Sequence, residues 1–550
     1  MIMKKLIVQH KRLLTLLLFL AASLISIYLT ELNGHIWSFL TMSNDGRFHI
    51  MRIEGLAQAM RQGNLTPIVN MSFLGGLGYI SNVFYSNLWL YPAAVLRLMG
   101  LTITQAFVSF YVLLNFVTFL TSFGAFYKAS QRYDKSLLFS FVYTLSTYRI
   151  FDMVRRFDVG ELSTFVFLPI VVLGVYEIFY NNHHQWIYLT IGMVGVIYSH
   201  ALSPVLIGIF IVLVMIFRIK TLVKEPQRIL ALFYAGVSSL MLSLAYFMPM
   251  LEQMRHTQFK LTNAPLINVS QTEMSWPDLL NWSVHNDLYK QNIGLIMLVT
   301  AITIPLIIWK IKNVAIRDFA IIGELLLVMT TNIFPWKFFD KTPLNMIQFP
   351  WRFYMIVSIL FAIVIAADPL GIFSGNWKKV LMILFALGLV MNSERILVQQ
   401  YPREDDAYTQ FNHLDVDSIG SGQEYLPKNA SLTALIKAPH APQVLSGQAK
   451  ISNFSQVGSK VTFHFQAAQN AKVSVPIICY YGYSAKDSTG QVSKLRMDKN
   501  NNGLGQIIVN GKGVVRIDYE KTPVQRISKV ISLASLFLGL MYFARKKFKK

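Results

Sequence analysis

Three side chains of complementary chemistry follow the first apolar segment of the chain. Residues 44–52 read Asn-Asp-Gly-Arg-Phe-His-Ile-Met-Arg, which spaces Asp45, His49 and Arg52 at i, i+4 and i+7. If this segment is helical from Gly46 onward, a carboxylate, an imidazole and a guanidinium share one face. The carboxylate can act as general base towards a hydroxyl, or can bind Mg²⁺ or Mn²⁺ together with His49. The alternative is that Asn44 or Asp45 only caps the helix.

A second charged cluster, residues 148–161, contains three arginines and three carboxylates. Guanidinium groups bind phosphate through paired hydrogen bonds, and neighbouring carboxylates can orient a sugar. For most of these residues, a solvated and self-paired loop between two helices is the favoured interpretation. Arg156 and Glu161 are exceptions because they adjoin the apolar run that starts at Leu162. We predict that these two residues contribute to a substrate site.

A third group lies where another apolar run begins, and it reads Gln348-Phe-Pro-Trp-Arg352-Phe. Arg352 suits the phosphate of a membrane lipid, with Gln348 and the aromatic rings beside it. The alternative is an ordinary aromatic belt with an arginine that extends to the membrane interface. His200, near the end of a further apolar run, is a candidate for the same site. A lone membrane histidine more often makes a hydrogen bond between helices.

The elements that must position these groups are transmembrane helices. Hydrophobic residues make up 54% of the 550-residue chain, charged residues make up 14%, and the mean hydropathy is +0.44. These values indicate a polytopic α-helical membrane protein. The net charge of +22 resides in short patches beside the apolar runs, which indicates membrane topology rather than nucleic-acid binding. The single cysteine, Cys479, excludes a disulfide framework within the chain.

Twelve apolar runs predict membrane spans, near 13–30, 103–127, 136–151, 162–180, 186–201, 203–218, 229–250, 292–309, 316–333, 350–367, 377–393 and 527–543. An even number of spans places both basic termini in the cytoplasm, in agreement with the positive-inside rule. The apolar stretch 88–99 is left out of this count. We assign it, with a helix over 46–61, to the outer membrane interface.

The predicted spans define three regions. Residues 1–393 form a transmembrane domain whose first outer loop, 31–102, carries juxtamembrane helices. In 394–526, alternating strands with turns at 500–503 and 510–513 predict a small β-sandwich-like outer domain. Residues 527–550 form a final transmembrane helix with a basic cytoplasmic tail.

This arrangement resembles the glycosyltransferase C (GT-C) superfamily, in which a charged motif with a leading aspartate follows the first helix. More narrowly, the chain resembles the bacterial YfhO-like membrane proteins, often labelled "6-pyruvoyl-tetrahydropterin synthase-related". The resemblance covers most of the length. It rests on residues 44–49, 91–94, 156–161, 348–353, 422–427 and 480–483.

The resemblance implies an inverting glycosyltransferase at the outer face of a bacterial cell membrane. Such an enzyme moves a sugar from a polyprenyl-phosphate-linked donor in the bilayer to a cell-surface glycopolymer such as lipoteichoic acid. Asp45 matches the catalytic aspartate of the first loop, and the phosphate would leave towards Arg352, with help from Arg156 or Arg52. The pterin label implies no chemistry here. Two other classes stay open, a transporter or flippase of lipid-linked saccharides and a non-catalytic cell-envelope scaffold.

Overall fold

The computed structural model describes residues 2–31, 43, 45–263, 267–400, 419–420, 422–487, 492–493 and 495–548. Asn44 and much of both predicted outer segments, 32–42 and 401–418, lie outside the described residues. The chain divides into two compact units. The first comprises Met1–Gly46, Thr104–Ser239 and Ile267–Asn412, and the second comprises Arg47–Ile103, Leu240–Leu266 and His413–Lys550.

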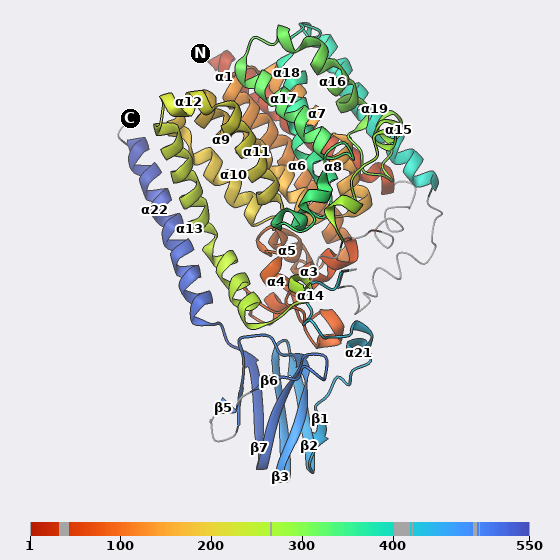
Figure 1. Ribbon diagram of the computed structural model, residues 1–550, viewed down its shortest axis with the longest axis vertical. Coiled ribbons are helices and arrows are strands. Elements are labelled where there is room, and N and C mark those ends of the chain that lie inside the picture. Colours follow the sequence, from red (N-terminus) through yellow and green to blue (C-terminus); the bar gives the residue numbers. More distant parts are fainter. Residues whose placement is uncertain are drawn as a thin grey trace. The chain divides into compact units, whose positions relative to one another are not determined.

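The first unit is built from helices, as the composition predicts (Figure 1). Its principal elements are α1 (Ile2–Glu31), α6 (Ile103–Ser130), α7 (Tyr133–Thr144), α8 (Thr147–Phe151), α9 (Val159–Tyr180), α10 (Ile187–Ile197), α11 (Ser203–Phe217), α12 (Ile219–Lys224), the first part of α13 (Gln227–His256), α15 (Trp276–His285), α16 (Gly294–Ile307), α17 (Val314–Met329), α18 (Tyr354–Ala367) and α19 (Asn376–Gln400).

Seven described helices are long and apolar enough to cross a membrane: His10–Ile27, Ile103–Ser130, Val159–Tyr180, Gln227–His256, Pro350–Ala367, Asn376–Gln399 and Pro523–Met541. Shorter apolar helices fall at Leu88–Leu98, Ser203–Phe217 and Gly294–Lys310. Several other predicted spans are helices of fewer than eighteen residues, among them α7, α10 and α17. A membrane protein with many helices is therefore confirmed, whereas the count of twelve spans stays a prediction.

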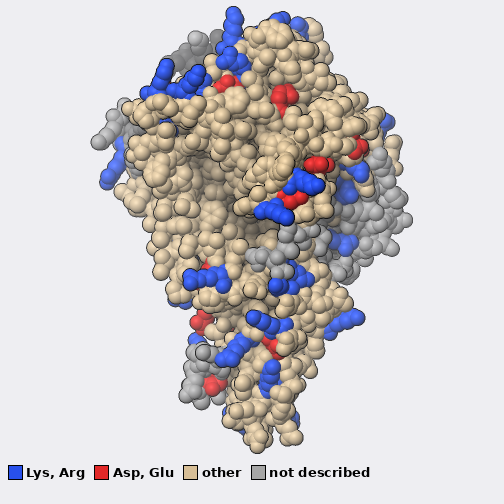
Figure 2. All heavy atoms as spheres, in the orientation of Figure 1, with Lys and Arg blue, Asp and Glu red and all other residues tan. Residues whose placement is uncertain are grey.

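Charged side chains gather at one end of the first unit. Arg218, Lys220 and Lys224 cluster in and beside α12. On the face drawn in Figure 2, Lys and Arg side chains collect around that end, and the helical surface next to it is largely uncharged. This distribution is the one expected where helices leave the hydrocarbon core of a bilayer.

Helices α9 and α10 approach each other closely because glycines line their contact. A Cβ added at Gly174 would lie 2.2 Å from the backbone nitrogen of Leu189, and one at Gly192 would lie 2.6 Å from that of Val171. Small residues allow helix backbones to approach in this way, which membrane proteins use in place of hydrophobic burial. The contact fixes α9, which carries Glu161 in its first turn.

Gly174→Ala should therefore lower the stability of the protein by about 1–3 kcal/mol, because the added methyl group forces two helices apart. The matched control is Gly208→Ala on α11, where an added Cβ meets no atom within 4 Å. Both substitutions raise helix propensity by a similar amount, so their difference isolates the packing effect. Thermal unfolding of the purified protein measures it. Equal melting temperatures for the two variants would contradict the close contact.

The second unit combines helices with an antiparallel sheet. Its helices are α3 (Gly46–Arg61), α4 (Ser81–Phe84), α5 (Tyr91–Leu98), the second part of α13, α14 (Lys260–Asn263), α21 (Leu432–Ile436) and α22 (Pro523–Phe548). Its strands are β1 (Gln443–Ser446), β2 (Ala449–Val457), β3 (Lys460–Ile478), β4 (Tyr483–Lys486), β5 (Val492–Ser493), β6 (Arg496–Met497) and β7 (Leu504–Tyr519).

The described strands form one sheet, with the order β1-β3-β7-β4-β5 and with β2 and β6 attached to β3 and β7. The antiparallel strands are confirmed, but the described strands do not form the two sheets of a sandwich. The predicted turn at 500–503 is present, whereas that at 510–513 is wrong because β7 continues through it. Gly511 adopts a φ of +74° beside a bulge, where the register of β3 and β7 shifts. Asn-Gly here marks a bulge within a long strand.

The segment 47–103 and the sheet share one hydrophobic core. Phe84 stacks on Tyr425 with ring centroids 4.4 Å apart, and the backbone nitrogen of Ile478 donates to the carbonyl of Leu77 at 2.8 Å. Side chains from 48–84 and from 419–504 are buried together in this core. Residues 47–103 therefore belong to the same folded body as the C-terminal sheet.

Candidate functional site

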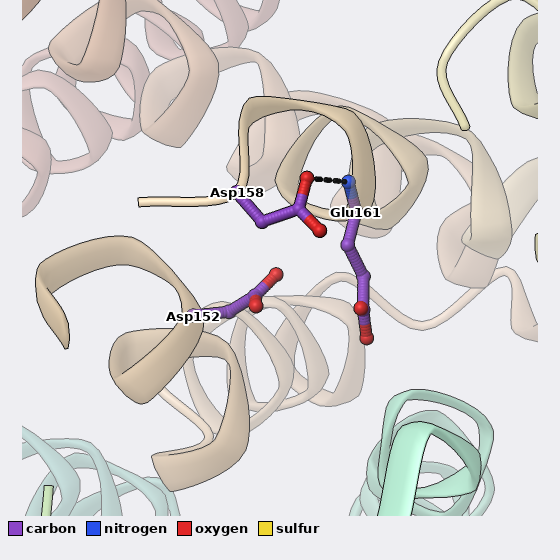
Figure 3. A group of neighbouring side chains, drawn as sticks. All are labelled: Asp152, Asp158 and Glu161. Atoms are coloured by element: carbon purple, nitrogen blue, oxygen red, sulfur yellow. Dashed lines mark hydrogen bonds between the residues drawn. The ribbon is translucent and has the colours of Figure 1, made fainter. Parts of the chain in front are cut away.

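A sharp turn between α8 and α9 builds a charged cluster inside the first unit. The π-helical segment η3 (Asp152–Arg156) follows α8, and Phe157 then adopts a left-handed φ of 56°. Asp158 caps α9 by accepting hydrogen bonds from the backbone nitrogens of Gly160 at 2.9 Å and Glu161 at 3.1 Å. Figure 3 shows Asp158 at the start of α9, with Asp152 beside it on the preceding turn. The turn thus gathers carboxylates that the sequence spaces over ten residues.

Arg156 lies at the centre of these carboxylates. Its Nη1 is 2.5 Å from Asp152 Oδ1 and 2.8 Å from Glu161 Oε2, and its Nη2 is 2.9 Å from Asp158 Oδ2. These four side chains are buried. Asp45 Oδ2 lies 3.8 Å from Arg156 Nη2, and the Asp45 side chain is 36% exposed. Asp45 is therefore the accessible carboxylate of the cluster.

Burial and neighbouring charges shift the pKa values of two members of the cluster, Asp152 and Arg156. Burial, together with the charge of Glu161, raises the pKa of Asp152 well above its usual value, although Arg156 opposes the shift. Burial lowers the pKa of Arg156, but the surrounding carboxylates outweigh it and raise the pKa. Arg156 therefore stays cationic, while Asp152 tends to keep a proton. Asp152 Oδ2 is buried without a hydrogen-bond partner among the described residues.

The same acids have the geometry of a cation site. Asp152, Asp158 and Glu161 each offer an oxygen, and these atoms lie within 4.8 Å of one another. The Arg156 guanidinium already contacts all three carboxylates. It supplies the positive charge that a metal ion would otherwise bring. Metal binding by Asp45 and His49 stays a prediction.

Arg352 approaches the cluster from the start of α18. It belongs to the turn η9 (Pro350–Phe353) and donates through Nη1 to the carbonyl of Ile347 at 2.9 Å. Its Nε is 4.0 Å from Glu161 Oε2 and is buried without a hydrogen-bond partner among the described residues. Its guanidinium carbon lies 4.9 Å from the ring centroid of Phe349. A buried donor of this kind suits an anionic ligand.

Gln348 and Trp351 shape the surroundings of Arg352. Gln348 adopts a φ of 60°, a conformation that non-glycine residues rarely take, and its Oε1 lies 3.5 Å from Arg352 Nη1. The Trp351 ring centroid is 4.9 Å from the guanidinium carbon of Arg156 and 5.8 Å from that of Arg352. This indole therefore contacts both cations, which the aromatic-belt interpretation did not predict.

His200 lies at the edge of the same cluster. Its Nδ1 is 2.8 Å from Ser203 Oγ, which is 3.3 Å from Thr164 Oγ1 on α9. The negative charges of Asp158 and Glu161 interact electrostatically with the imidazole of His200. The structure thus links His200 to the second turn of α9, and its ring is buried.

His49 and Arg52 belong to the second unit. Both lie on α3, with Arg52 Nη1 3.1 Å from His49 Nδ1, so the predicted shared face is present for this pair. Arg52 Nη2 donates to the carbonyls of Tyr85 at 3.0 Å and Ser86 at 2.8 Å. Both His49 and Arg52 are 1% exposed. These contacts give Arg52 a role in holding the segment after α4.

The structure brings six predicted site residues together in the first unit: Asp45, Arg156, Glu161, His200, Gln348 and Arg352. The charges over 148–161 are self-paired between two helices, as predicted, but the prediction that they are solvated is wrong, because Asp152 and Asp158 are buried against Arg156. Two local signals could have identified them. Asp158 stands at the N-cap position of an apolar helix, and Asp152 precedes Arg156 by one helical turn.

Comparison with known proteins gives a distant bacterial relative. No protein-family model matches the chain. The chain is 24% identical over 582 aligned positions to a protein of Lactococcus lactis subsp. cremoris (strain MG1363), with 92% of each chain covered. That protein is described only as an uncharacterized protein. The similarity extends over both units and places a relative of this chain in a bacterium.

Proposed function

We propose that this protein is a GT-C-type glycosyltransferase of the bacterial cell membrane. It transfers a sugar from a polyprenyl-phosphate donor to a cell-surface glycopolymer such as lipoteichoic acid. The observation that carries the proposal is the pairing of a partly exposed carboxylate with a buried, unsatisfied guanidinium donor in one cluster. These groups are Asp45 and Arg352, and both adjoin the Arg156 network.

The reaction requires one proton acceptor and one site for a leaving phosphate. The acceptor hydroxyl attacks the anomeric carbon of the donor sugar, and the bond from that carbon to the phosphate oxygen breaks. Asp45 takes the hydroxyl proton, and the polyprenyl phosphate leaves with the electron pair, which inverts the anomeric configuration. Arg352 neutralises the charge that develops on the phosphate. Phe349 and Trp351 supply apolar surface for the isoprenoid.

Arg156 has a different role in this proposal from the one expected from sequence. Its guanidinium is already bound to Asp152, Asp158 and Glu161, so binding phosphate would break buried ion pairs. We assign Arg156 as a positioning residue that holds Asp45 through a side-chain contact and a backbone hydrogen bond of 3.2 Å. Arg52 likewise uses its donors on the 85–87 segment.

A deletion strain tests the proposed function. The sugar content of lipoteichoic acid and of wall polymers is compared by mass spectrometry in wild type, deletion and complemented strains. Loss of one sugar on deletion, restored by complementation, supports the proposal and identifies donor and acceptor. An unchanged set of surface sugars would overturn it.

Arg352→Gln should reduce donor turnover by about 10²-fold to 10³-fold, because one charged group facing the leaving phosphate is lost. Release of polyprenyl phosphate by the purified protein measures this effect. The matched control is Arg317→Gln, at the start of α17, which should retain full turnover. An Arg352→Gln protein with normal turnover would remove this residue from the phosphate site.

A further inference from the structure

A polar pocket of about 270 Å³ lies within the second unit, and its lining includes none of the residues of the Arg156 cluster. Its wall is formed by the end of α3, the segment 62–76 and the hairpin that joins β2 to β3. A water molecule takes about 30 Å³ in the liquid, and pockets for small ligands begin near 300 Å³. The volume thus fits one small polar group, such as a sugar ring.

The lining of the pocket is polar and uncharged. Amide side chains come from Gln58, Gln62, Asn64 and Gln456, and hydroxyl groups come from Ser72 and Ser459. None of the lining residues is charged. A phosphate or a carboxylate would find no counter-charge there, whereas a neutral hydroxyl-rich ligand would find both donors and acceptors.

Two of these amides are fixed in place by hydrogen bonds. Ser72 Oγ donates to Gln58 Oε1 at 3.0 Å, and Gln456 Nε2 donates to the carbonyl of Gly76 at 2.7 Å. These bonds use the carbonyl oxygen of Gln58 and the amide nitrogen of Gln456. The side-chain nitrogen of Gln58 can therefore still donate a hydrogen bond, and the side-chain oxygen of Gln456 can still accept one. A sugar hydroxyl is both donor and acceptor, so it matches this pair.

Backbone and apolar atoms complete the wall. Gly75 and Gly76 have φ values of +62° and +95°, a conformation that favours glycine, so these two lining positions contribute backbone atoms alone. Val69 and Met71 supply apolar surface of the kind that the C–H groups of a sugar ring contact. The site therefore combines fixed amides, glycine backbone and a small apolar area.

We infer that this pocket binds one neutral sugar unit of the acceptor glycopolymer. The inference rests on the proposed function for the identity of the polymer, and it assigns a saccharide-binding subsite to the second unit. Such a subsite would retain a growing or repeating chain on the protein between transfer steps.

Saturation-transfer NMR tests the inference on the full-length protein in lipid nanodiscs, free of sugar-based detergents. The probes are methyl glucoside, methyl galactoside, N-acetylglucosamine and N-acetylgalactosamine, each without donor. We expect transfer of saturation to at least one probe. Ala59→Trp, which fills the pocket from α3, should abolish the signal. Gln62→Ala, at an exposed side chain, should weaken binding about fivefold, as expected for one lost hydrogen bond.

The control Gln448→Trp adds the same side chain at the turn between β1 and β2, outside the lining residues, and should keep the signal. The inference is overturned if no probe binds the wild-type protein, or if Ala59→Trp binds as well as Gln448→Trp. Because no donor is present, saccharide binding is independent of transfer. Unchanged surface sugars in the deletion strain, with binding retained, would refute the proposed function alone.

Discussion

Asp45→Asn should reduce sugar transfer by about 10²-fold to 10⁴-fold, which is the usual effect of removing a general base. Asparagine has nearly the same shape as aspartate but cannot accept the proton of the attacking hydroxyl. The fold should survive, because the Asp45 side chain is 36% exposed and its contact with Arg156 is long, at 3.8 Å. Exposed ion pairs contribute little to stability.

The measurement combines mass spectrometry of surface polymers in the complemented deletion strain with thermal unfolding of the purified variant. Asp278→Asn, at an exposed acid in the first turn of α15, serves as the matched control and should restore wild-type sugar content. Full restoration by Asp45→Asn would remove this residue from the mechanism and favour a transporter or a scaffold.

Arg156→Leu should destabilise the protein by about 3–5 kcal/mol, because it leaves buried carboxylates without their cation. Asp152, Asp158 and Glu161 are at most 3% exposed, so water cannot replace the lost partner. The melting temperature of the purified protein reports the loss. Arg156→Lys should fall between wild type and Arg156→Leu, since an ammonium keeps the charge but cannot match the planar, multidentate contacts.

A double substitution separates lost charge from lost packing. Adding Glu161→Gln to Arg156→Leu removes one of the uncompensated buried charges, and it should recover part of the stability. Asp152→Asn alone should have a small effect, because burial already favours the neutral form of this side chain. Equal stability of Arg156→Leu and wild type would show that the network does not hold the first unit together.

Local patterns in the sequence predicted local structure well. The apolar runs became helices, and α9, α11 and α16 fall close to their predicted limits. The alternating segments became antiparallel strands. The shared face of His49 and Arg52 followed from helical spacing alone. These features depend on neighbours within a few residues, which the sequence displays directly.

Features that depend on distant residues were not predicted. The N-cap position of Asp158 and the one-turn spacing of Asp152 and Arg156 are visible locally, but the burial of both acids depends on the packing of other segments around the turn at Phe157. The contact between Arg352 and Glu161 joins positions far apart in the chain. The shared core of the first loop and the sheet is equally non-local: the backbone nitrogen of Tyr425 donates to the hydroxyl oxygen of Tyr79 at 3.0 Å.

The joint core of the second unit also has a consequence for biosynthesis. Residues 47–103 emerge from the ribosome roughly 300 residues before the sheet that completes their core. At about 5–20 residues per second, the interval is about 15–60 s. During that time Phe73 and Tyr79, which are fully buried in the finished protein, lack part of their packing partners. The nascent loop then exposes apolar side chains of the kind that make incompletely folded chains prone to aggregation. Translation that stops before residue 413 would leave this loop permanently without its partner.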